Sequence, residues 1–146
     1  MRRDVDEPFE KGECFTTQFS QLDTGKYEAN NRQYYGFYDG NSGSYSGGTG
    51  KTSFNGFMAG VYEIQWGTAV GPVYKILQTD YTSYTVYYSC TQWFAGITIL
   101  EAVWIATRSK LEDGSAAFNT MLPIVNGVLD DKLPHYDYNT RMRTTQ

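Results

Sequence analysis

The fold is decided by residues 73–109, which read VYKILQTDYTSYTVYYSCTQWFAGITILEAVWIATRS. Within this stretch, runs rich in β-branched and aromatic residues are separated by turn-forming residues, a pattern typical of short strands. In the first run Tyr74 and Ile76 alternate with Lys75, so one face of the strand is expected to be buried and the other wet. The predicted strands are Val73–Thr79, Tyr84–Thr91 and Ile97–Thr107.

Four earlier runs have the same character and are also cut by turn residues. They are Cys14–Leu22, Tyr27–Tyr38, Ser44–Phe54 and Phe57–Trp66. The glycine-rich stretch Gly47–Gly50 lies inside the third run, where we predict a bent strand, because glycine in a strand marks sharp curvature or a bulge. Seven short strands at this spacing indicate a sandwich or an up-and-down barrel.

The C-terminal part has helical periodicity instead. Its apolar residues recur at spacings of three and four and form one stripe, which we expect to pack on the outside of the sheet. They are Phe118, Met121, Leu122, Val125, Val128 and Leu129. Asp113 or Ser115 offers an N-cap, Pro123 either kinks the helix or starts a new turn, and Gly127 and Pro134 mark its end.

Composition limits the classes of function. The chain has 146 residues, which suits one domain, and its net charge is −4, without a basic patch for nucleic acid. No apolar stretch is long enough to span a membrane, and no signal peptide is visible at the first residues. Aromatic residues make up 16% of the chain, and such side chains favour strands and line pockets for flat apolar ligands.

Residues 73–109 also resemble a known family. Thr79-Asp80-Tyr81, the Tyr-Ser-Cys at 88–90 and the Trp-Ile-Ala-Thr-Arg at 104–108 are similar to segments of the lipocalins, in the branch of apolipoprotein D, bilin-binding proteins and crustacyanins. Phe9–Cys14 resembles the start of that branch's second barrel strand. The resemblance implies an all-β fold, a lipocalin-like antiparallel up-and-down β-barrel with one C-terminal α-helix packed outside.

The front of the chain departs from the family pattern. The first strand with its G-x-W motif is not found, so the resemblance implies about seven of eight strands, with unpaired edges on the second and last strands. The similar-looking Gly60–Ile64 is interpreted as an ordinary strand. We expect a single lipocalin-like domain over residues 1–146. Its parts are an N-terminal arm (1–12), barrel strands (13–108), the helix (113–129) and a C-terminal tail (130–146).

The two cysteines, Cys14 and Cys90, are expected to be thiols, with one bridge between them as the alternative. In the apolipoprotein D branch the cysteine matching Cys14 bonds near the C-terminus and the one matching Cys90 near the N-terminus. Neither partner is present in this chain, so the resemblance implies that neither family bridge forms.

Alternation combined with the resemblance predicts the residues that line the barrel. Phe19, Tyr62, Trp66, Tyr74 and Trp104 would offer apolar faces to a ligand, while Asn31 and the tyrosine hydroxyls would orient a carbonyl or hydroxyl group. Core filling is the alternative role for each aromatic residue. The full predicted ligand-binding set is Thr17, Phe19, Tyr27, Ala29, Asn31, Tyr62, Ile64, Trp66, Tyr74, Ile76 and Trp104.

A structural role is predicted for residues at the closed end of the barrel: Thr79, Asp80, Tyr81 and Arg108. By resemblance, Arg108 would pack on the tryptophan of the missing motif. In its absence Arg108 is expected to hydrogen-bond to main-chain carbonyls at that end.

The expected function is binding and transport or sequestration of a small hydrophobic ligand: a carotenoid, bilin, retinoid, steroid or fatty acid. The resemblance also implies a secreted, extracellular protein. The alternative is an interaction protein whose open barrel edge pairs with another chain as a homo- or hetero-oligomer. A thiol enzyme using Cys14 is a third reading, but no catalytic arrangement, metal cluster or cofactor motif supports an enzyme, and His135 is interpreted as a surface residue.

Overall fold

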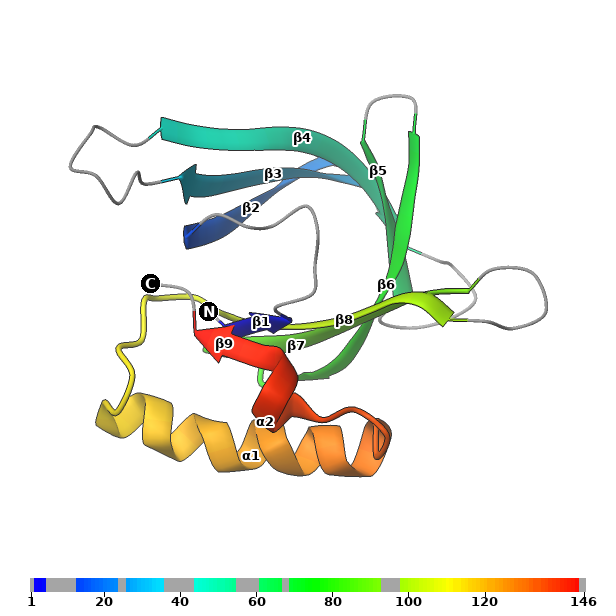
Figure 1. Ribbon diagram of the computed structural model, residues 1–146. Helices are drawn as coiled ribbons and strands as arrows, with labels where there is room; N and C mark the ends of the chain where they lie inside the picture. Colours follow the sequence, from blue (N-terminus) through cyan, green and yellow to red (C-terminus); the bar gives the residue numbers. More distant parts are fainter. Residues whose placement is uncertain are drawn as a thin grey trace.

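One curled antiparallel sheet makes up most of the molecule (Figure 1). This computed structural model describes residues 2–4, 13–23, 26–35, 44–54, 61–66, 69–92 and 98–144. The nine strands follow the order β2-β3-β4-β5-β6-β7-β8-β1-β9. They are β1 (Arg2–Asp4), β2 (Glu13–Asp23), β3 (Lys26–Tyr35), β4 (Ser44–Phe54), β5 (Val61–Trp66), β6 (Ala69–Thr79), β7 (Tyr84–Gln92), β8 (Thr98–Thr107) and β9 (Met142–Thr144).

The strands from β2 to β8 follow the chain order, as an up-and-down barrel requires. β5 and β6 cross from the layer of β2–β4 to the layer of β7 and β8, so the sheet wraps around an interior (Figure 1). The glycine-rich β4 is one continuous strand that pairs with β3 through Gly47–Gly50. The predicted bounds of this strand and its bent-strand interpretation agree with the structure.

β6 begins at Ala69, earlier than the predicted start at Val73. The register explains the difference, because Glu63 pairs with Val73 and Gln65 pairs with Val70. Two residues of β6, one of them a proline without an N–H, therefore oppose one residue of β5 in a bulge. The predicted extensions of two other strands, 36–38 and 57–60, lie outside the described residues.

Two predictions were wrong at residues Arg2–Asp4. This segment is a strand rather than part of an arm, and it pairs with the last barrel strand, whose edge was expected to be unpaired. Residues Arg2–Asp4 form β1, which pairs with β8 through Arg2↔Ile105 and Arg3↔Trp104. β1 also pairs with β9, which lies in the predicted tail. The physical reason is that an edge strand presents unpaired N–H and C=O groups, which another short strand can satisfy. β2 stands at the other end of the sheet order, so hydrogen bonds among the described residues do not close the barrel.

The main helix, α1 (Ala116–Lys132), lies against the outside of the sheet (Figure 1). Ser115 is its N-cap, and its Oγ accepts the N–H of Phe118 at 3.3 Å. The helix begins and ends three residues later than the predicted 113–129, and Pro123 and Gly127 both lie inside it. A single glycine costs a helix only about 1 kcal/mol, which packing of the flanking apolar residues can exceed. A short helix, α2 (Tyr138–Arg141), precedes β9.

The main hydrophobic core lies between α1 and the outer face of β7 and β8. Val86, Val103 and Ile105 from the sheet and Val125 and Leu129 from the helix are all 0% exposed. Further buried members from the sheet, the helix and the C-terminal segment are Tyr84, Phe118, Met121, Leu133, Tyr136 and Met142. The predicted helical stripe therefore packs outside the barrel as expected, and the interior is left to other residues.

Candidate ligand site in the barrel interior

Strand register places the predicted lining positions on one face of the sheet. Directly opposed residues in an antiparallel pair lie on the same face, so each row of partners defines a common side. Across strands β2–β5 the rows of paired residues are 17–31–48, 19–29–50–66 and 27–52–64. Across strands β5–β8 one row is 62–74–89–102. A last row, 76–87–104, begins on β6 and runs to β8. The side chains of Asn31, Tyr62, Ile64 and Trp66 lie outside the described residues.

Two halves of this face meet inside the barrel. Ala29 on β3 packs against Tyr74 and Ile76 on β6 and Tyr87 on β7. β3 and β6 are separated by two strands in the sheet order, so this contact crosses the interior rather than running along a hydrogen-bonded ladder. The ring centroids of Tyr74 and Trp104 are 5.4 Å apart with planes tilted by 50°, a favourable aromatic arrangement. We call Ala29, Tyr74, Ile76, Tyr87 and Trp104 the interior cluster.

The members of the interior cluster differ in exposure. Ala29 is fully buried and Trp104 is 4% exposed, whereas Tyr74, Ile76 and Tyr87 are only half-buried. Gly50, which pairs with Ala29, is also buried. The buried floor of the site is therefore formed by Ala29, Gly50 and Trp104. Tyr74, Ile76 and Tyr87 leave part of their surface accessible.

Three predicted lining residues lie away from this floor. Tyr27 is half-buried, and Thr17 and Phe19 on β2 are exposed, Phe19 by 44%. Phe19 is in register with Ala29 as the alternation predicted, but β2 is the end strand of the sheet. A side chain on an end strand has a neighbouring strand on one side only, which explains why these two are not enclosed.

Two polar residues of the interior face, Tyr87 and Ser89, were not predicted from the sequence. Ser89 is 3% exposed, and its hydroxyl donates to the carbonyl of Val73 at 2.9 Å. Burial raises the pKa of Tyr87 above its ordinary value, and its hydroxyl is hydrogen-bonded to the side chain of Thr85. The alternation rule applied to β7 would have found both, because Thr85, Tyr87 and Ser89 alternate with Val86 and Tyr88.

The turn between β6 and β7 is organised by Asp80. Its Oδ1 accepts the main-chain N–H groups of Thr82, Ser83 and Tyr84 at 3.0, 2.8 and 3.0 Å, and its Oδ2 accepts the Ser83 hydroxyl. The Ser83 hydroxyl, followed by the main-chain donors, holds the pKa of Asp80 well below its ordinary value. Asp80 therefore acts as a turn-forming carboxylate.

Thr79, Tyr81 and Arg108 complete this end of the barrel. Tyr81 has a φ of 63°, an uncommon conformation for a residue with a side chain. Its N–H donates to Thr79 Oγ1 at 3.0 Å, and its carbonyl accepts Arg108 Nη2 at 3.1 Å. The N–H of Arg108 also donates to the carbonyl of Ser83 at 2.9 Å. Arg108 thus contacts the main-chain carbonyls of the turn.

A second polar cluster lies on the helix side of the sheet, around Glu101. Its Oε1 accepts the Tyr88 hydroxyl at 2.9 Å and contacts His135 Nε2 at 2.7 Å, and Arg141 donates to its Oε2 and its main-chain carbonyl at 3.2 and 2.8 Å. The Arg141 guanidinium also stacks over the Tyr136 ring, 4.6 Å from the centroid. His135 has an exposed side chain, as predicted, and its ring nitrogen contacts this cluster through Glu101.

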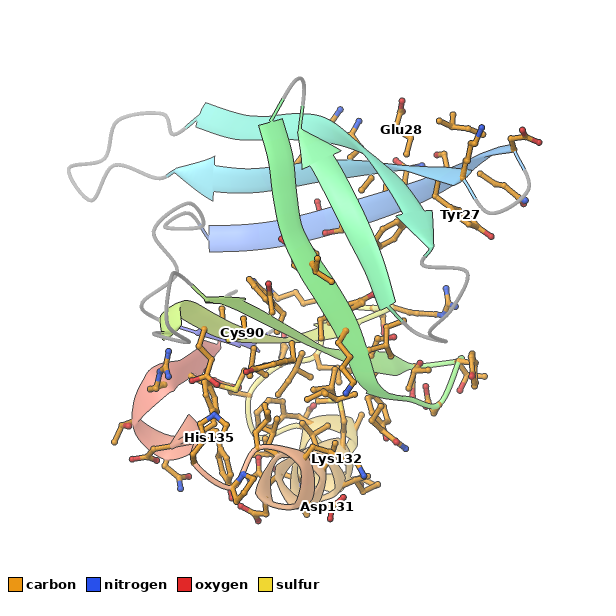
Figure 2. All side chains as sticks on the ribbon, turned by 90° about the vertical axis from the view of Figure 1, so that its right-hand side faces the viewer. Tyr27, Glu28, Cys90, Asp131, Lys132 and His135 are labelled. Atoms are coloured by element: carbon orange, nitrogen blue, oxygen red, sulfur yellow. The ribbon has the colours of Figure 1, made fainter. Side chains whose placement is uncertain are left out.

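Cys90 is half-buried, is present as a thiol, and pairs with Glu101 in register. Figure 2 places Cys90 and His135 near the helix, on the other side of the molecule from Tyr27. The side chain of Cys14 lies outside the described residues. Within the part of the chain that the structure describes, no His, Cys, Asp or Glu group of three or more could hold a metal ion, and no helix is long and apolar enough to cross a membrane.

Comparison with known proteins agrees with this geometry. Apolipoprotein D of Rattus norvegicus and that of Mus musculus are each 30% identical to the chain over 102 residues, 69% of this chain and 51% of the relative. The chain therefore spans about half the length of these curated relatives. No family model matches the sequence.

Solved structures share the fold over nearly the whole chain. Lobster apocrustacyanin A1 superposes with a TM-score of 0.73 at 23% identity, covering 99% of this chain and 72% of its own. Insecticyanin from the tobacco hornworm Manduca sexta has a TM-score of 0.70 at 20% identity, covering 99% and 74%. The strand order, the helix outside the barrel and these superpositions lead to one conclusion: the chain has the fold of the lipocalins, and its sequence is similar to that of apolipoprotein D.

Proposed function

We propose that the protein carries a small hydrophobic ligand inside its barrel, bound against the interior cluster. The observation that supports this most directly is the contact of Ala29 with Tyr74, Ile76 and Tyr87 across the interior. It brings apolar groups from opposite sides of the barrel to one place. Trp104, tilted against Tyr74, extends this surface with a second aromatic face.

The incomplete burial of the interior cluster favours binding over simple core filling. Tyr74, Ile76 and Tyr87 remain half-exposed on the concave side of the sheet, whereas the outward residues of β7 and β8 are covered by α1. Removing apolar surface from water contributes roughly 25 cal/mol per Å². A flat apolar ligand lying on these side chains would therefore bind by burying surface that the chain leaves open.

The relatives are consistent with such a role. The structural neighbours include crustacyanins and insecticyanin, and the curated relatives are apolipoproteins D. On this basis we propose an extracellular carrier whose ligand belongs among carotenoids, bilins, retinoids, steroids and fatty acids. Thr17, Phe19, Tyr27, Asn31, Tyr62, Ile64 and Trp66 remain further lining residues of this proposed site, as alternation along the strands predicts.

Titration with apolar ligands tests this proposal through tryptophan fluorescence. A carotenoid, a retinoid and a steroid are added separately, and at least one is expected to give saturable quenching. Replacing Trp104 by Phe should reduce the quenching amplitude, whereas the control Tyr88→Phe, on the outward face of the same sheet, should leave it unchanged. If no ligand of the three classes gives saturation, the carrier proposal is wrong.

A second candidate function, pairing with another chain through β2, has one observation in its favour. β2 ends the sheet order, and every side chain from Thr16 to Asp23 is exposed. Its run Thr16–Leu22 has neither charge nor proline, the features that usually protect an edge from pairing. Light scattering over a concentration series tests it. An oligomer that Gln18→Lys dissociates is expected, and a wild-type monomer at every concentration would rule it out.

A further inference from the structure

The C-terminal segment Leu133–Thr144 runs from the end of α1 to the edge of the sheet, where β9 lies beside β1 (Figure 1). Three of its side chains, Leu133, Tyr136 and Met142, are buried in the core between α1 and the sheet. Most of the positions between them are exposed: 134, 135, 137, 139 and 140. The segment is therefore attached at a few points, so the loss of one of them should loosen it as a whole.

Arg141 attaches this segment to β8 by polar contacts. Its Nη1 donates to Oε2 of Glu101 at 3.2 Å, and its Nη2 donates to the main-chain carbonyl of the same residue at 2.8 Å. Because one guanidinium binds both the side chain and the backbone of Glu101, it fixes the position of the segment along β8. The guanidinium also stacks on Tyr136, which joins the polar attachment to the apolar one. The side chains of Arg141 and Glu101 are 27% and 11% exposed, so water screens the ion pair only in part.

The strand β1 is held from one side by β9, which begins directly after Arg141. β9 pairs with all three residues of β1. On its other side β1 meets β8 through Arg2↔Ile105 and Arg3↔Trp104. A three-residue strand forms too few hydrogen bonds with one neighbour to offset the entropy lost when its backbone is ordered. We therefore expect β1 to stay on β8 only while β9 pairs with it.

We propose that residues 133–144 act as a strap, anchored by Arg141 on Glu101, that holds β1 against β8. When this anchor is lost, β9 and β1 leave the sheet together as one cooperative unit, while the barrel strands stay folded. Their departure uncovers the edge of β8 at Trp104, a member of the interior cluster, so the strap is linked to the wall of the proposed ligand site. The strap needs no ligand and stands independently of the proposed carrier function.

Hydrogen exchange of main-chain amides, followed by NMR under native conditions, tests this proposal. Arg141→Met removes the donors and keeps an unbranched apolar side chain beside Tyr136. The amides of β1 and β9 should then exchange about tenfold faster than in the wild type and by a common factor, whereas those of β3 and β4 should keep their rates. If β9 exchanges faster and β1 does not, or if neither strand changes, the strap does not hold β1 and the proposal is wrong.

Lys132→Met is the matched control, because it removes a nearby cation that is paired only at the surface. Lys132 Nζ lies 2.8 Å from Asp131 Oδ2, and the two side chains are 56% and 69% exposed. Such exposed pairs contribute little to stability, so exchange in β1 and β9 should stay at the wild-type rates. Equally fast exchange in this control and in Arg141→Met would overturn the role of Arg141 as the anchor.

A measurement on the wild type keeps the proposal testable if Arg141→Met does not fold. In urea below the unfolding transition, the amides of β1 and β9 should open with one common free energy and one urea dependence. That free energy should be lower than the opening free energy of the amides in β7 and in the middle of α1. Separate opening of the two strands, or opening only with the whole molecule, would contradict the strap.

Discussion

The two faces of β7 and β8 differ sharply although they come from the same strands. Residues that point outward, including Val86, Val103 and Ile105, are completely buried under α1. On the inward face, Tyr87 and its neighbours Tyr74 and Ile76 on β6 are only half-buried. The position of a residue in the alternation decides which environment it enters.

This difference separates the source of stability from the place where we propose that a ligand binds. A well-packed helix–sheet core can hold the strands in place without filling the barrel, so aromatic surface inside remains available. Substitutions on the outer face should therefore affect unfolding most, and those on the inner face should affect ligand binding most.

Replacing Leu129 by Ala should cause the largest loss of stability, about 3 kcal/mol, because it creates a cavity in the core. The matched inner-face change Ile76→Ala should cost about 1 kcal/mol, since that side chain is only half-buried. Urea unfolding monitored by circular dichroism measures both. Equal losses for the two variants would contradict the division between the faces.

Glu101→Gln should lower the free energy of unfolding by about 2 kcal/mol, because the partly buried donors of Arg141 would lose their charged acceptor. Desolvation raises the pKa of Glu101, but the hydrogen bonds from His135 and Tyr88 and the charges of His135 and Arg141 lower it by more, to below its ordinary value. The stabilisation is therefore present at neutral pH and is lost as the pH falls below about 4.5.

Unfolding of the wild type and of Glu101→Gln at several pH values checks the sign of this effect. The two stability curves should lie apart at pH 7 and approach each other in acid. Curves that stay parallel down to pH 3 would show that the carboxylate of Glu101 does not anchor Arg141 and the C-terminal segment.

Ser115→Ala should cost about 1 kcal/mol, because the N–H of Phe118 would lose its capping acceptor. Ser115→Asp is the matched control, since its carboxylate can accept the same N–H and suits a helix N-terminus. Thermal unfolding followed at a helix-sensitive wavelength measures both variants. Equal melting temperatures for alanine and aspartate at this position would mean that the cap contributes nothing.

Asp80→Asn should have the smallest effect on global stability, because the turn it supports is solvent-exposed. The change should instead speed hydrogen exchange at the N–H groups of Ser83 and Tyr84, which Asp80 accepts. In the wild type the low pKa of Asp80 keeps the carboxylate ionised far into acid, which carbon-13 NMR of the carboxyl group would detect. An ordinary titration of that carboxyl would contradict the turn geometry.

Periodicity predicted the fold where a segment carries its own pattern. The bounds of β4 follow from local residue types, and the outer stripe of α1 follows from its spacing. Local residue types left Asp113 and Ser115 as two candidates for the N-cap, of which the structure uses Ser115. The lipocalin fold could be predicted from the resemblance of Thr79-Asp80-Tyr81, the Tyr-Ser-Cys at 88–90 and the segment ending at Arg108 to lipocalin segments.

Features that depend on a distant partner could not be predicted in this way. Arg2–Asp4 has no strand pattern of its own and becomes a strand because β8 and β9 offer backbone partners. The exposure of Phe19 follows from the place of β2 in the sheet, which alternation within β2 does not reveal. Tyr87 was not predicted on the interior face, although its alternation with the outward residues Val86 and Tyr88 indicates that position.

The pairing of Ala29 with Gly50 has a consequence for how closely the two walls of the barrel approach each other. At this level the inner surface of β3 and β4 consists of one methyl group and bare backbone. Ala29 is fully buried and packs directly against Tyr74, so these smallest side chains let the two walls of the barrel meet at this level. A change of Ala29 to valine or leucine would press on Tyr74, Ile76 and Tyr87, so position 29 sets how closely the two walls approach below the space proposed for a ligand.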